Sequence, residues 1–225
     1  MKVVVLTGAG ISAESGLSTF RDGGGLWEGH DPMQVATPEA FNDDPALVHR
    51  FYDERRAALG RVEPNAAHRA LARLEEALGD DLFLVTQNVD DLHERGGSRR
   101  VHHMHGQLRS AWCLACNARH TWNDGLGHGP ACPGCESPSL RPDIVWFGEI
   151  PYGMEAIENA VWEADLFVSI GTSAIVYPAA AFVLWAQGET LELNLEPSAA
   201  TDDFTHARQG PATELVPAWV DELLS

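Results

Sequence analysis

The sequence predicts an α/β fold with a largely parallel sheet, helices on both faces and one small inserted module. Short apolar runs at residues 3–7, 82–86, 144–147, 166–170 and 191–194 are typical of strands. Several of them are apolar throughout rather than alternating, as in strands that are buried on both faces. Helical patterns lie between them, and alternating strands and helices favour a parallel sheet.

The helical patterns occupy residues 45–60 and 64–78, which are rich in Ala, Arg, Glu and Leu, and residues 178–187 and 213–224. The region from about Trp112 to Arg141 breaks the alternation, since it holds all four cysteines and many glycines and prolines. We expect a small module there with little regular structure. Residues 22–29 are rich in glycine and predict a mobile loop.

Composition narrows the class of protein. The 225 residues suit one domain, or one domain with an insert, and 44% of them are hydrophobic, which is enough for a core. The formal charge of −18 would repel phosphate backbones, so no nucleic acid partner is expected. No apolar run is long enough to span a membrane, and the N-terminus does not resemble a signal peptide. We expect a cytoplasmic protein, with a monomer favoured.

The four cysteines form two Cys-x2-Cys pairs separated by fifteen residues: Cys113, Cys116, Cys132 and Cys135. Two such pairs place four thiolates around one tetrahedral zinc ion. The alternatives are two disulfides or free thiols, and a cytoplasmic location disfavours disulfides. Four cysteines leave no open coordination position, so the zinc is expected to be structural.

A glycine-rich turn follows the first predicted strand. Gly8-Ala9-Gly10-Ile11-Ser12-Ala13 fits the pattern that brings a dinucleotide pyrophosphate close to the backbone at a helix N-terminus, as in Rossmann-like folds. A plain turn is the alternative. A hydride-transferring dehydrogenase would carry a second strand ending in Asp or Glu about 20 residues later. Residues 20–27 are a loop sequence instead, so we expect a dinucleotide held in an unusual way beneath a loop.

Polar residues follow three predicted strands, and the carboxyl ends of parallel strands share one edge of a sheet. These residues are Gln87, Asn88 and Asp90, then Gly171, Thr172 and Ser173, then Asn194, Leu195 and Glu196. Each cluster alone fits a turn or a helix cap, but three together indicate one site. His105 is a candidate general base, although sequence physics alone does not choose it, and His102 and His103 are expected at the surface.

Together these motifs resemble the sirtuins, the NAD-dependent protein deacylases, over nearly the whole chain. The matching segments occur in the family's order: Gly8 to Gly16, Thr19-Phe20-Arg21, Thr86 to Asp90, His105-Gly106, the four cysteines, Phe147-Gly148-Glu149, Gly171-Thr172-Ser173 and Asn194-Leu195-Glu196. The resemblance implies a single catalytic unit. Its Rossmann-like large domain would comprise about 1–25, 80–110 and 143–225, and its small domain a helical insertion, 26–79, and a zinc ribbon-like one, 111–142.

The resemblance also implies the chemistry. NAD would be a co-substrate, His105 the general base, and Asn88 and Asp90 the residues that position the ribose and the nicotinamide amide. The products would be free lysine, nicotinamide and O-acyl-ADP-ribose. The implied cofactor contacts, besides Asn88 and Asp90, are Gly8, Ala9, Gly10, Ile11, Ser12, Glu14, Thr19, Phe20, Arg21, Trp27, Gln87, Gly171, Thr172, Ser173, Asn194, Leu195, Glu196 and Ala212.

The implied substrate is an acylated-lysine segment of another protein, bound as an added strand. One side of it would face Val145, Trp146, Phe147, Gly148 and Glu149, and the other the segment after Ser173.

Tyr52-Asp53-Glu54-Arg55 resembles the motif of sirtuins that remove succinyl and malonyl groups. The i,i+3 spacing places Tyr52 and Arg55 on one helix face, where they would bind the acyl carboxylate. Ala36 matches a small residue that leaves this pocket roomy. On spacing alone Arg55 would be a solvated helix residue. Bacterial members of this class often retain deacetylase activity, so we expect a dual deacylase.

Three residues depart from the family pattern. Ser18 stands where proline is usual and is expected to loosen the cofactor loop. Asp91 stands where glycine is usual, and its charge is expected to weaken binding of an anionic acyl group. Met104 replaces leucine and is expected to be tolerated.

Three other functions compete with a deacylase. A mono-ADP-ribosyltransferase would share the NAD motifs, but Tyr52 and Arg55 favour deacylation. A non-catalytic NAD-sensing module would not need a base beside the ribose. A zinc-ribbon interaction protein would use only the cysteines.

Overall fold

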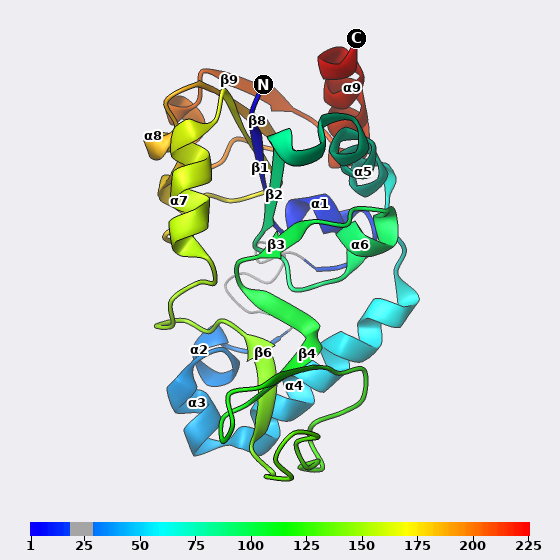
Figure 1. The fold of residues 1–225 in the computed structure, drawn as a ribbon, viewed down its shortest axis with the longest axis vertical. Helices are drawn as coiled ribbons and strands as arrows, with labels where there is room; N and C mark the ends of the chain where they lie inside the picture. The colour runs from blue at the N-terminus through cyan, green and yellow to red at the C-terminus, as the bar shows by residue number, and fades with distance from the viewer. Residues whose placement is uncertain (19–28) are drawn as a thin grey trace.

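The computed structural model describes residues 1–18 and 29–225 (Figure 1). Its strands are β1 Val3–Thr7, β2 Leu82–Thr86, β3 Val101–His103, β4 Gly106–Cys113, β5 Arg119–Thr121, β6 Leu140–Ile144, β7 Leu166–Ile170, β8 Glu189–Asn194 and β9 His206–Gln209. Its α-helices are α1 Gly10–Ala13, α2 Pro32–Val35, α3 Pro38–Asp43, α4 Pro45–Ala58, α5 Ala66–Leu78, α6 Leu92–Gly96, α7 Met154–Glu163, α8 Phe182–Trp185 and α9 Ala212–Leu224. Short 3-10 turns are η1 Leu59–Arg61, η2 Gly79–Asp81, η3 Ala179–Ala181 and η4 Thr201–Asp203.

The large sheet has the strand order β3-β2-β1-β7-β8-β9, and each neighbouring pair is parallel. The chain runs outward from β1 to β2 and β3, and later returns to the other side of β1 with β7. The switch between these two directions leaves a crevice at the carboxyl ends of β1 and β7, where α/β folds bind their ligands. The predicted α/β class with a parallel sheet is confirmed.

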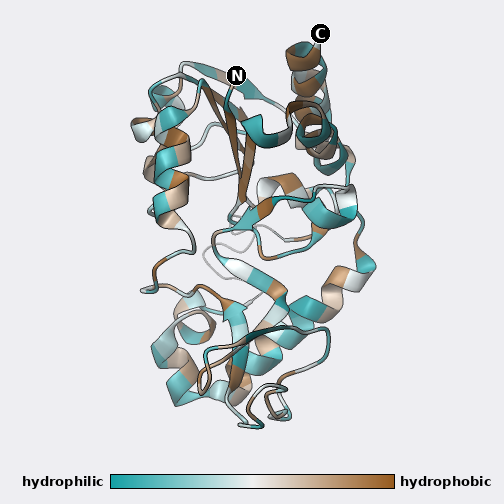
Figure 2. Ribbon diagram, in the orientation of Figure 1, coloured by the Kyte–Doolittle hydropathy of each residue, from teal (hydrophilic) through white to brown (hydrophobic). Residues whose placement is uncertain are grey.

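Helices cover both faces of this sheet. Residues of α5 and α9 pack on one face in a core that includes Leu71 and Trp219, and residues of α7 and α8 pack on the other in a core that includes Phe167 and Phe182. Figure 1 shows α7 and α8 on one side of the sheet and α5 and α9 on the other. In Figure 2 the central strands are hydrophobic, in accord with the burial of all five residues of β1 and of four of the five residues in each of β2 and β7.

Local signals explain where the long helices begin. Asp44 accepts a hydrogen bond from the Leu47 backbone N–H and precedes Pro45, which starts α4. At α5 the Asn65 side chain accepts from the backbone N–H groups of Ala67 and His68, and the His68 ring accepts from the Asn65 N–H in return. The predicted helices at 45–60 and 64–78 therefore lie within two residues of the observed ones.

The small sheet is antiparallel, in the order β5-β4-β6, and lies with α2, α3 and α4 at the opposite end of the molecule from both termini (Figure 1). A third core joins these parts, with Tyr52 and Trp146 at its centre. The strand predicted at 144–147 is wrong in position and in pairing: β6 spans Leu140–Ile144 and pairs antiparallel with β4 instead of joining the parallel sheet. β6 ends at Ile144 because the chain then turns through Trp146 and Glu149, whose backbone groups bond each other.

The helix predicted at 178–187 is also only partly right, since η3 and the short α8 take its place. The backbone becomes extended at Ala186, which ends α8, and a side chain at Gly188 would meet the Asp165 carbonyl oxygen at 2.3 Å, so glycine is required just before β8. Strands β3, β4, β5 and β9 were not predicted. β3 spans only three residues, two of which are histidines, and every residue of β9 is exposed, so neither gives an apolar run.

Within residues 1–18 and 29–225, the helices are all too short or too polar to cross a lipid bilayer.

Candidate active site

Three glycines bring the loops after β1 and β7 into direct contact. The Gly8 N–H donates to the Ile170 carbonyl and the Gly10 N–H to the Gly171 carbonyl, at 2.9 and 2.8 Å. A Cβ atom on Gly10 would meet the Gly171 backbone at 2.7 Å, and Gly171 itself has a φ of +63°. These glycines are therefore required where the two loops cross at the carboxyl ends of β1 and β7. The helix that follows, α1, is only one turn long, so its dipole adds little.

Asn88 and Asp90 lie buried at the end of β2 and share one partner. The Ser12 hydroxyl donates to the Asp90 carboxylate at 3.0 Å and accepts from the Asn88 amide at 3.2 Å. The Asn88 amide also donates to the Gly8 carbonyl at 3.1 Å. Burial raises the pKa of Asp90, against the bonds from Leu92 and Ser12 that lower it. The ends of β1 and β2 are thus tied into one polar cluster.

His105 lies between β3 and β4, half-buried. Its Nδ1 lies 3.1 Å from the Gln87 carbonyl oxygen, which only accepts, so Nδ1 carries the hydrogen and Nε2 keeps a lone pair. Burial lowers the pKa of His105, although the bond to Gln87 raises it. The ring is therefore neutral at neutral pH, with a basic nitrogen oriented by the end of β2.

The remaining predicted cofactor residues divide by position. Gln87, Thr172 and Asn194 converge, since the Gln87 amide donates to the Thr172 hydroxyl and the Asn194 amide donates to the Thr172 carbonyl. The Glu14 carboxylate faces the start of α9, where it accepts from the Thr213 N–H, one residue after Ala212.

Four other predicted contacts differ in exposure. Ile11 is buried in the core, so only its backbone is available to a ligand. Leu195 and Glu196 are exposed, and Ser173 is half-buried.

A pocket brings Arg55 together with Asn88 and Asp90. It is lined by Ala9, Ser12, Leu17, Ser18, Arg55, Ala58, Leu59, Gln87, Asn88, Val89, Asp90 and Leu108. Arg56, the residue after Arg55 on α4, is buried and does not line the pocket. Its Nε lies 2.6 Å from the Leu108 carbonyl oxygen and its Nη1 lies 2.6 Å from Asp53. The two adjacent arginines therefore differ in role: Arg56 joins α4 to β4, and Arg55 faces the pocket.

Tyr52 and Ala36 do not line this pocket. Tyr52 is fully buried, and its hydroxyl accepts from the Trp146 indole N–H at 3.0 Å. Burial raises the pKa of Tyr52, while the neighbouring Arg55 charge lowers it. Ala36 is buried in the same core, and its carbonyl accepts from the Phe147 N–H. Tyr52 and Arg55 thus lie near each other on α4, but only Arg55 reaches the pocket surface in this structure.

The segment predicted to bind the substrate, Val145 to Glu149, is held firmly by the chain itself. The N–H groups of Val145 and Phe147 donate to His105 and Ala36, and the Trp146 N–H donates to Glu149. The Trp146 carbonyl accepts from the Glu149 N–H, and at Gly148 a Cβ atom would meet nothing within 4 Å. Arg141 fixes Glu149 through both carboxylate oxygens and stacks on the Trp146 ring.

The four cysteines form a cluster in which the Sγ atoms all lie within 4.8 Å of one another. The Cys113–Cys135 and Cys116–Cys132 Sγ distances are 3.7 and 3.8 Å. A tetrahedron with Zn–S bonds of about 2.3 Å has S···S edges of about 3.8 Å. The cluster therefore fits a zinc ion closed by four thiolates, and disulfides, at about 2.0 Å, do not describe it.

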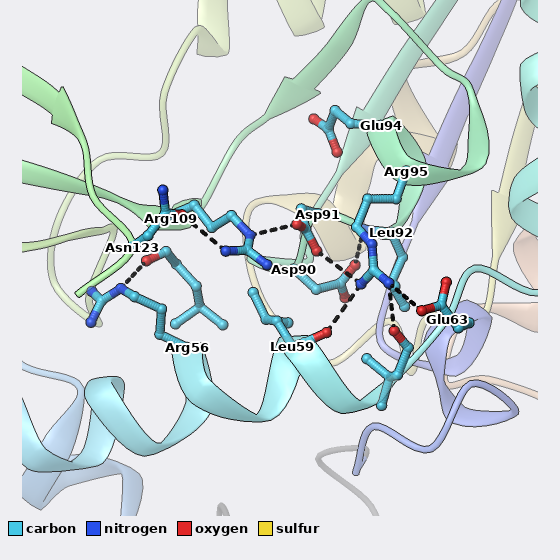
Figure 3. A network of polar contacts seen from close by, with 12 residues as sticks. Arg56, Leu59, Glu63, Asp90, Asp91, Leu92, Glu94, Arg95, Arg109 and Asn123 are labelled. Atoms are coloured by element: carbon cyan, nitrogen blue, oxygen red, sulfur yellow. Dashed lines mark hydrogen bonds and ion pairs between the residues drawn. The ribbon is translucent and has the colours of Figure 1, made fainter. Parts of the chain in front are cut away.

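Asp91, whose negative charge was expected to weaken binding of an anionic acyl group, is paired with arginines. Its carboxylate lies 2.5 Å from Arg109 of β4 and 3.6 Å from Arg95 of α6 (Figure 3). Arg95 also donates to the carbonyls of Leu59 and Val62 beyond α4. This network joins η1, α6 and β4. Arg109 compensates the charge of Asp91, and Arg95, which is shared with Glu63 at 2.9 Å, adds to this, so Asp91 is not an unpaired charge beside the site.

His103 is the main residue that the sequence placed wrongly. It is buried rather than at the surface, and its ring contacts both the Asn88 carbonyl and Glu94. His102 is half-buried, with Nε2 2.8 Å from the Tyr152 carbonyl oxygen. The burial of His103 was missed because strand β3 was not predicted, and it is the pairing of β3 with β2 that places His103 opposite Thr86. Thr19, Phe20, Arg21 and Trp27, predicted to contact the cofactor, lie outside the described residues.

Comparison with known proteins agrees with this geometry. Residues 8–178 match the model of the Sir2 family. The chain is 56% identical to an NAD-dependent protein deacylase of Caulobacter vibrioides, over all of this chain and 98% of that protein. It is 51% identical to an NAD-dependent protein deacylase of Escherichia coli O6:H1, over 99% of this chain and 84% of that one.

Solved structures are similar as well. A crystal structure of a Sir2 homologue in complex with NAD matches with a TM-score of 0.88 at 40% identity, over all of this chain and 91% of that one. A Sir2 variant bound to a deacetylated peptide and 3′-O-acetyl-ADP-ribose matches with a TM-score of 0.85 at 31% identity, over 98% and 93% of the two chains.

Proposed function

This chain belongs to the Sir2 family and is an NAD-dependent protein deacylase, and we propose that it removes succinyl and malonyl groups, and also acetyl groups, from protein lysines. The products would be nicotinamide, free lysine and O-acyl-ADP-ribose. We further propose a cytoplasmic location and a single catalytic unit, in which residues 1–25, 80–110 and 143–225 form the NAD-binding part and 26–79 and 111–142 the small part.

The position of Arg55 is the observation that carries the acyl specificity. Its side chain lines the pocket that Asn88 and Asp90 also line. A guanidinium at a half-buried position binds a carboxylate through two parallel bonds, which an acetyl group does not offer. Asp90 lines the same pocket, so a cation there is also needed to offset its charge when an anionic acyl group enters.

The residues of the crevice fit NAD. Gly8, Gly10 and Gly171 bring the loops after β1 and β7 together at the sheet's switch point, and Gln87, Thr172 and Asn194 provide polar groups beside it. When bound, NAD supplies a ribose carbon that takes the acyl oxygen as nicotinamide leaves. We assign the nicotinamide amide to Asp90 and the ribose to Asn88, because both side chains are fixed by Ser12 beside that crevice.

His105 acts as the general base in this proposal. Its Nδ1–H is held by Gln87, so Nε2 is available to take a proton from a ribose hydroxyl. Its lowered pKa keeps that nitrogen unprotonated at neutral pH.

The acylated peptide would lie between Gly148 and the segment after Ser173. Ile175 and Tyr177 on that segment are 68% and 76% exposed, and Phe147 on the other side is 40% exposed, so both sides offer apolar surface. A similar Sir2 structure holds a deacetylated peptide, which supports this mode of binding.

Steady-state kinetics on one peptide sequence carrying succinyl-, malonyl-, butyryl- or acetyl-lysine tests the proposal. Butyryl is the matched control, since it has the size of succinyl without the carboxylate. We expect succinyl and malonyl peptides to have a higher kcat/KM than butyryl peptide. A higher kcat/KM for butyryl peptide than for succinyl peptide would contradict the proposal that the pocket binds a carboxylate.

A further inference from the structure

His103 is held between two hydrogen-bond acceptors inside the protein. Its Nδ1 lies 3.1 Å from the carbonyl oxygen of Asn88, and its Nε2 lies 2.7 Å from a carboxylate oxygen of Glu94. A carbonyl oxygen and an ionised carboxylate accept hydrogens and cannot donate them. Both ring nitrogens must therefore carry a hydrogen to make both bonds, which means that the arrangement calls for an imidazolium.

The bond to Asn88 fixes the backbone of a residue that belongs to the proposed site. The side chain of Asn88 donates to Gly8 and Ser12, and its N–H donates to the Thr86 hydroxyl. His103 holds the remaining backbone group, the carbonyl. β3 pairs with β2 so that His103 lies opposite Thr86, just before Asn88. We call the two bonds of the His103 ring, to the Asn88 carbonyl and to Glu94, the His103 clamp. The clamp therefore lies at the end of β2, where the polar residues Asn88 and Asp90 follow the strand.

The charges around His103 favour this state. Burial alone would lower the pKa of His103, but the bond to Glu94 and its charge, the Asn88 carbonyl and the Asp90 charge together raise it above its ordinary value. Of the titratable groups that face it in the described residues, Glu94 and His93 come from α6 and Asp90 from the loop after β2. Burial keeps the pKa of His93 well below its ordinary value, so that ring is neutral. Conversely, the charge of His103 opposes the effect of burial on Asp90.

We propose that His103 is a positioning residue for NAD binding: as an imidazolium bonded to Glu94 and to the Asn88 carbonyl, it holds Asn88 and Asp90 in place, and this support is lost when the ring deprotonates as the pH rises. The proposal rests on the proposed function for its assignment of Asn88 and Asp90 to NAD. His103 touches neither NAD nor the acyl group in this account.

The direction of the pH effect follows from the raised pKa. Below the ordinary histidine value, near pH 6.5, the ring is charged in both folded and unfolded chains, and the clamp is fully present. As pH rises through the raised pKa of the folded state, the ring loses one proton. A neutral imidazole donates from one nitrogen only, so either Asn88 or Glu94 loses its donor.

The test is the NAD dissociation constant measured by calorimetry from about pH 6 to about pH 9.5, a range that brackets histidine titration. In the unaltered protein we expect affinity to fall on the alkaline side. Glu94→Gln should move that fall to lower pH, because the variant removes the charge that stabilises the imidazolium. His103→Gln should bind NAD about tenfold more weakly near neutral pH, as loss of one bond to a charged group implies, and should lose this alkaline dependence.

His102→Gln is the matched control. It removes the neighbouring histidine, which contacts the Tyr152 carbonyl, and it should keep the alkaline fall of the unaltered protein. The thermal unfolding temperature of each variant shows whether it is folded. Glu94 is 40% exposed at its side chain, so the Glu94→Gln arm stands even where His103→Gln fails to fold.

Two results would overturn the inference: an alkaline fall that is the same in Glu94→Gln as in the unaltered protein, or His103→Gln that binds NAD with unchanged affinity and pH dependence. The proposed function has its own readout in acyl-peptide turnover. A protein that shows the expected pH dependence of NAD binding but transfers no acyl group refutes the proposed function and leaves this inference standing.

Discussion

Replacement of Arg55 by Met should separate the two proposed activities. Arg55 is half-buried at the pocket, with its guanidinium carbon 5.5 Å from the centre of the Phe51 ring. Methionine keeps the apolar contact with that ring and removes the charge. Succinyl and malonyl groups lose their carboxylate partner in the variant, whereas an acetyl group loses nothing.

The magnitude follows from the bonds removed. A hydrogen bond to a charged group contributes about 1.5–3 kcal/mol, and Arg55 would make two to one carboxylate. Solvent competes at a half-buried position, so we take the low end, about 3 kcal/mol in total. Since about 1.4 kcal/mol corresponds to a factor of ten, kcat/KM for succinyl peptide should fall by about 10²-fold. Acetyl peptide should be turned over at the unaltered rate or slightly faster.

The assay is kcat/KM for matched succinyl- and acetyl-lysine peptides. Arg50→Met is the control, because Arg50 is an exposed arginine of the same helix, and it should leave both values unchanged. Arg55→Lys should lie between the two, since lysine keeps the charge but not the paired geometry. Equal loss of both activities in Arg55→Met would refute the reasoning, because it would mean that Arg55 supports the site rather than the acyl carboxylate.

Three further outcomes are expected. His105→Ala should abolish deacylation while the far-UV circular dichroism spectrum stays unchanged, and normal turnover by this variant would exclude His105 as the base. In the unaltered protein, kcat/KM should fall on the acid side only below about pH 6.5, because burial lowers the pKa of His105. Removal of zinc by a chelator should lower the unfolding temperature, since the small core around Cys113 and Cys132 depends on the cluster, and an equally stable metal-free protein would contradict this. Arg56→Met should reduce the free energy of unfolding by about 3 kcal/mol, measured by denaturant titration. The variant removes the bonds from Arg56 to the Leu108 carbonyl and to Asp53, and Asp53 then keeps only the Leu126 and Gly127 N–H donors among the described residues. A change below about 1 kcal/mol would show that the buried pair is not structural.

The parallel sheet could be predicted because its central strands are buried on both faces. β1, β2 and β7 are apolar runs bounded by turn residues, and their observed bounds match the predicted ones. β9 escaped prediction because an edge strand with exposed side chains carries no such run. The strand expected at 144–147 failed for a different reason: its apolar residues serve the core around Tyr52, so burial there reflects a packed turn and not a sheet.

The parts of the site that could be predicted from the sequence are those that depend only on residue type and spacing. Four cysteines at metal-binding spacing predict their own convergence, and the structure shows it. The difference between Arg55 and Arg56 could not be read from adjacent positions on a helix, since it depends on where β4 places the Leu108 carbonyl. Likewise, His103 reveals its partners only once β3 is aligned with β2, because Asn88 and Glu94 come from separate segments of the chain.

The most direct test of the proposed activity is mass spectrometry of one peptide carrying either succinyl-lysine or acetyl-lysine, incubated with the protein in the presence and absence of NAD. We predict NAD-dependent loss of the succinyl group, with O-succinyl-ADP-ribose and nicotinamide as products, and a slower loss of acetyl. Loss of acetyl alone would contradict the acyl specificity assigned to Arg55. Cleavage of NAD with both acyl groups intact, or with ADP-ribose attached to protein, would contradict deacylation itself.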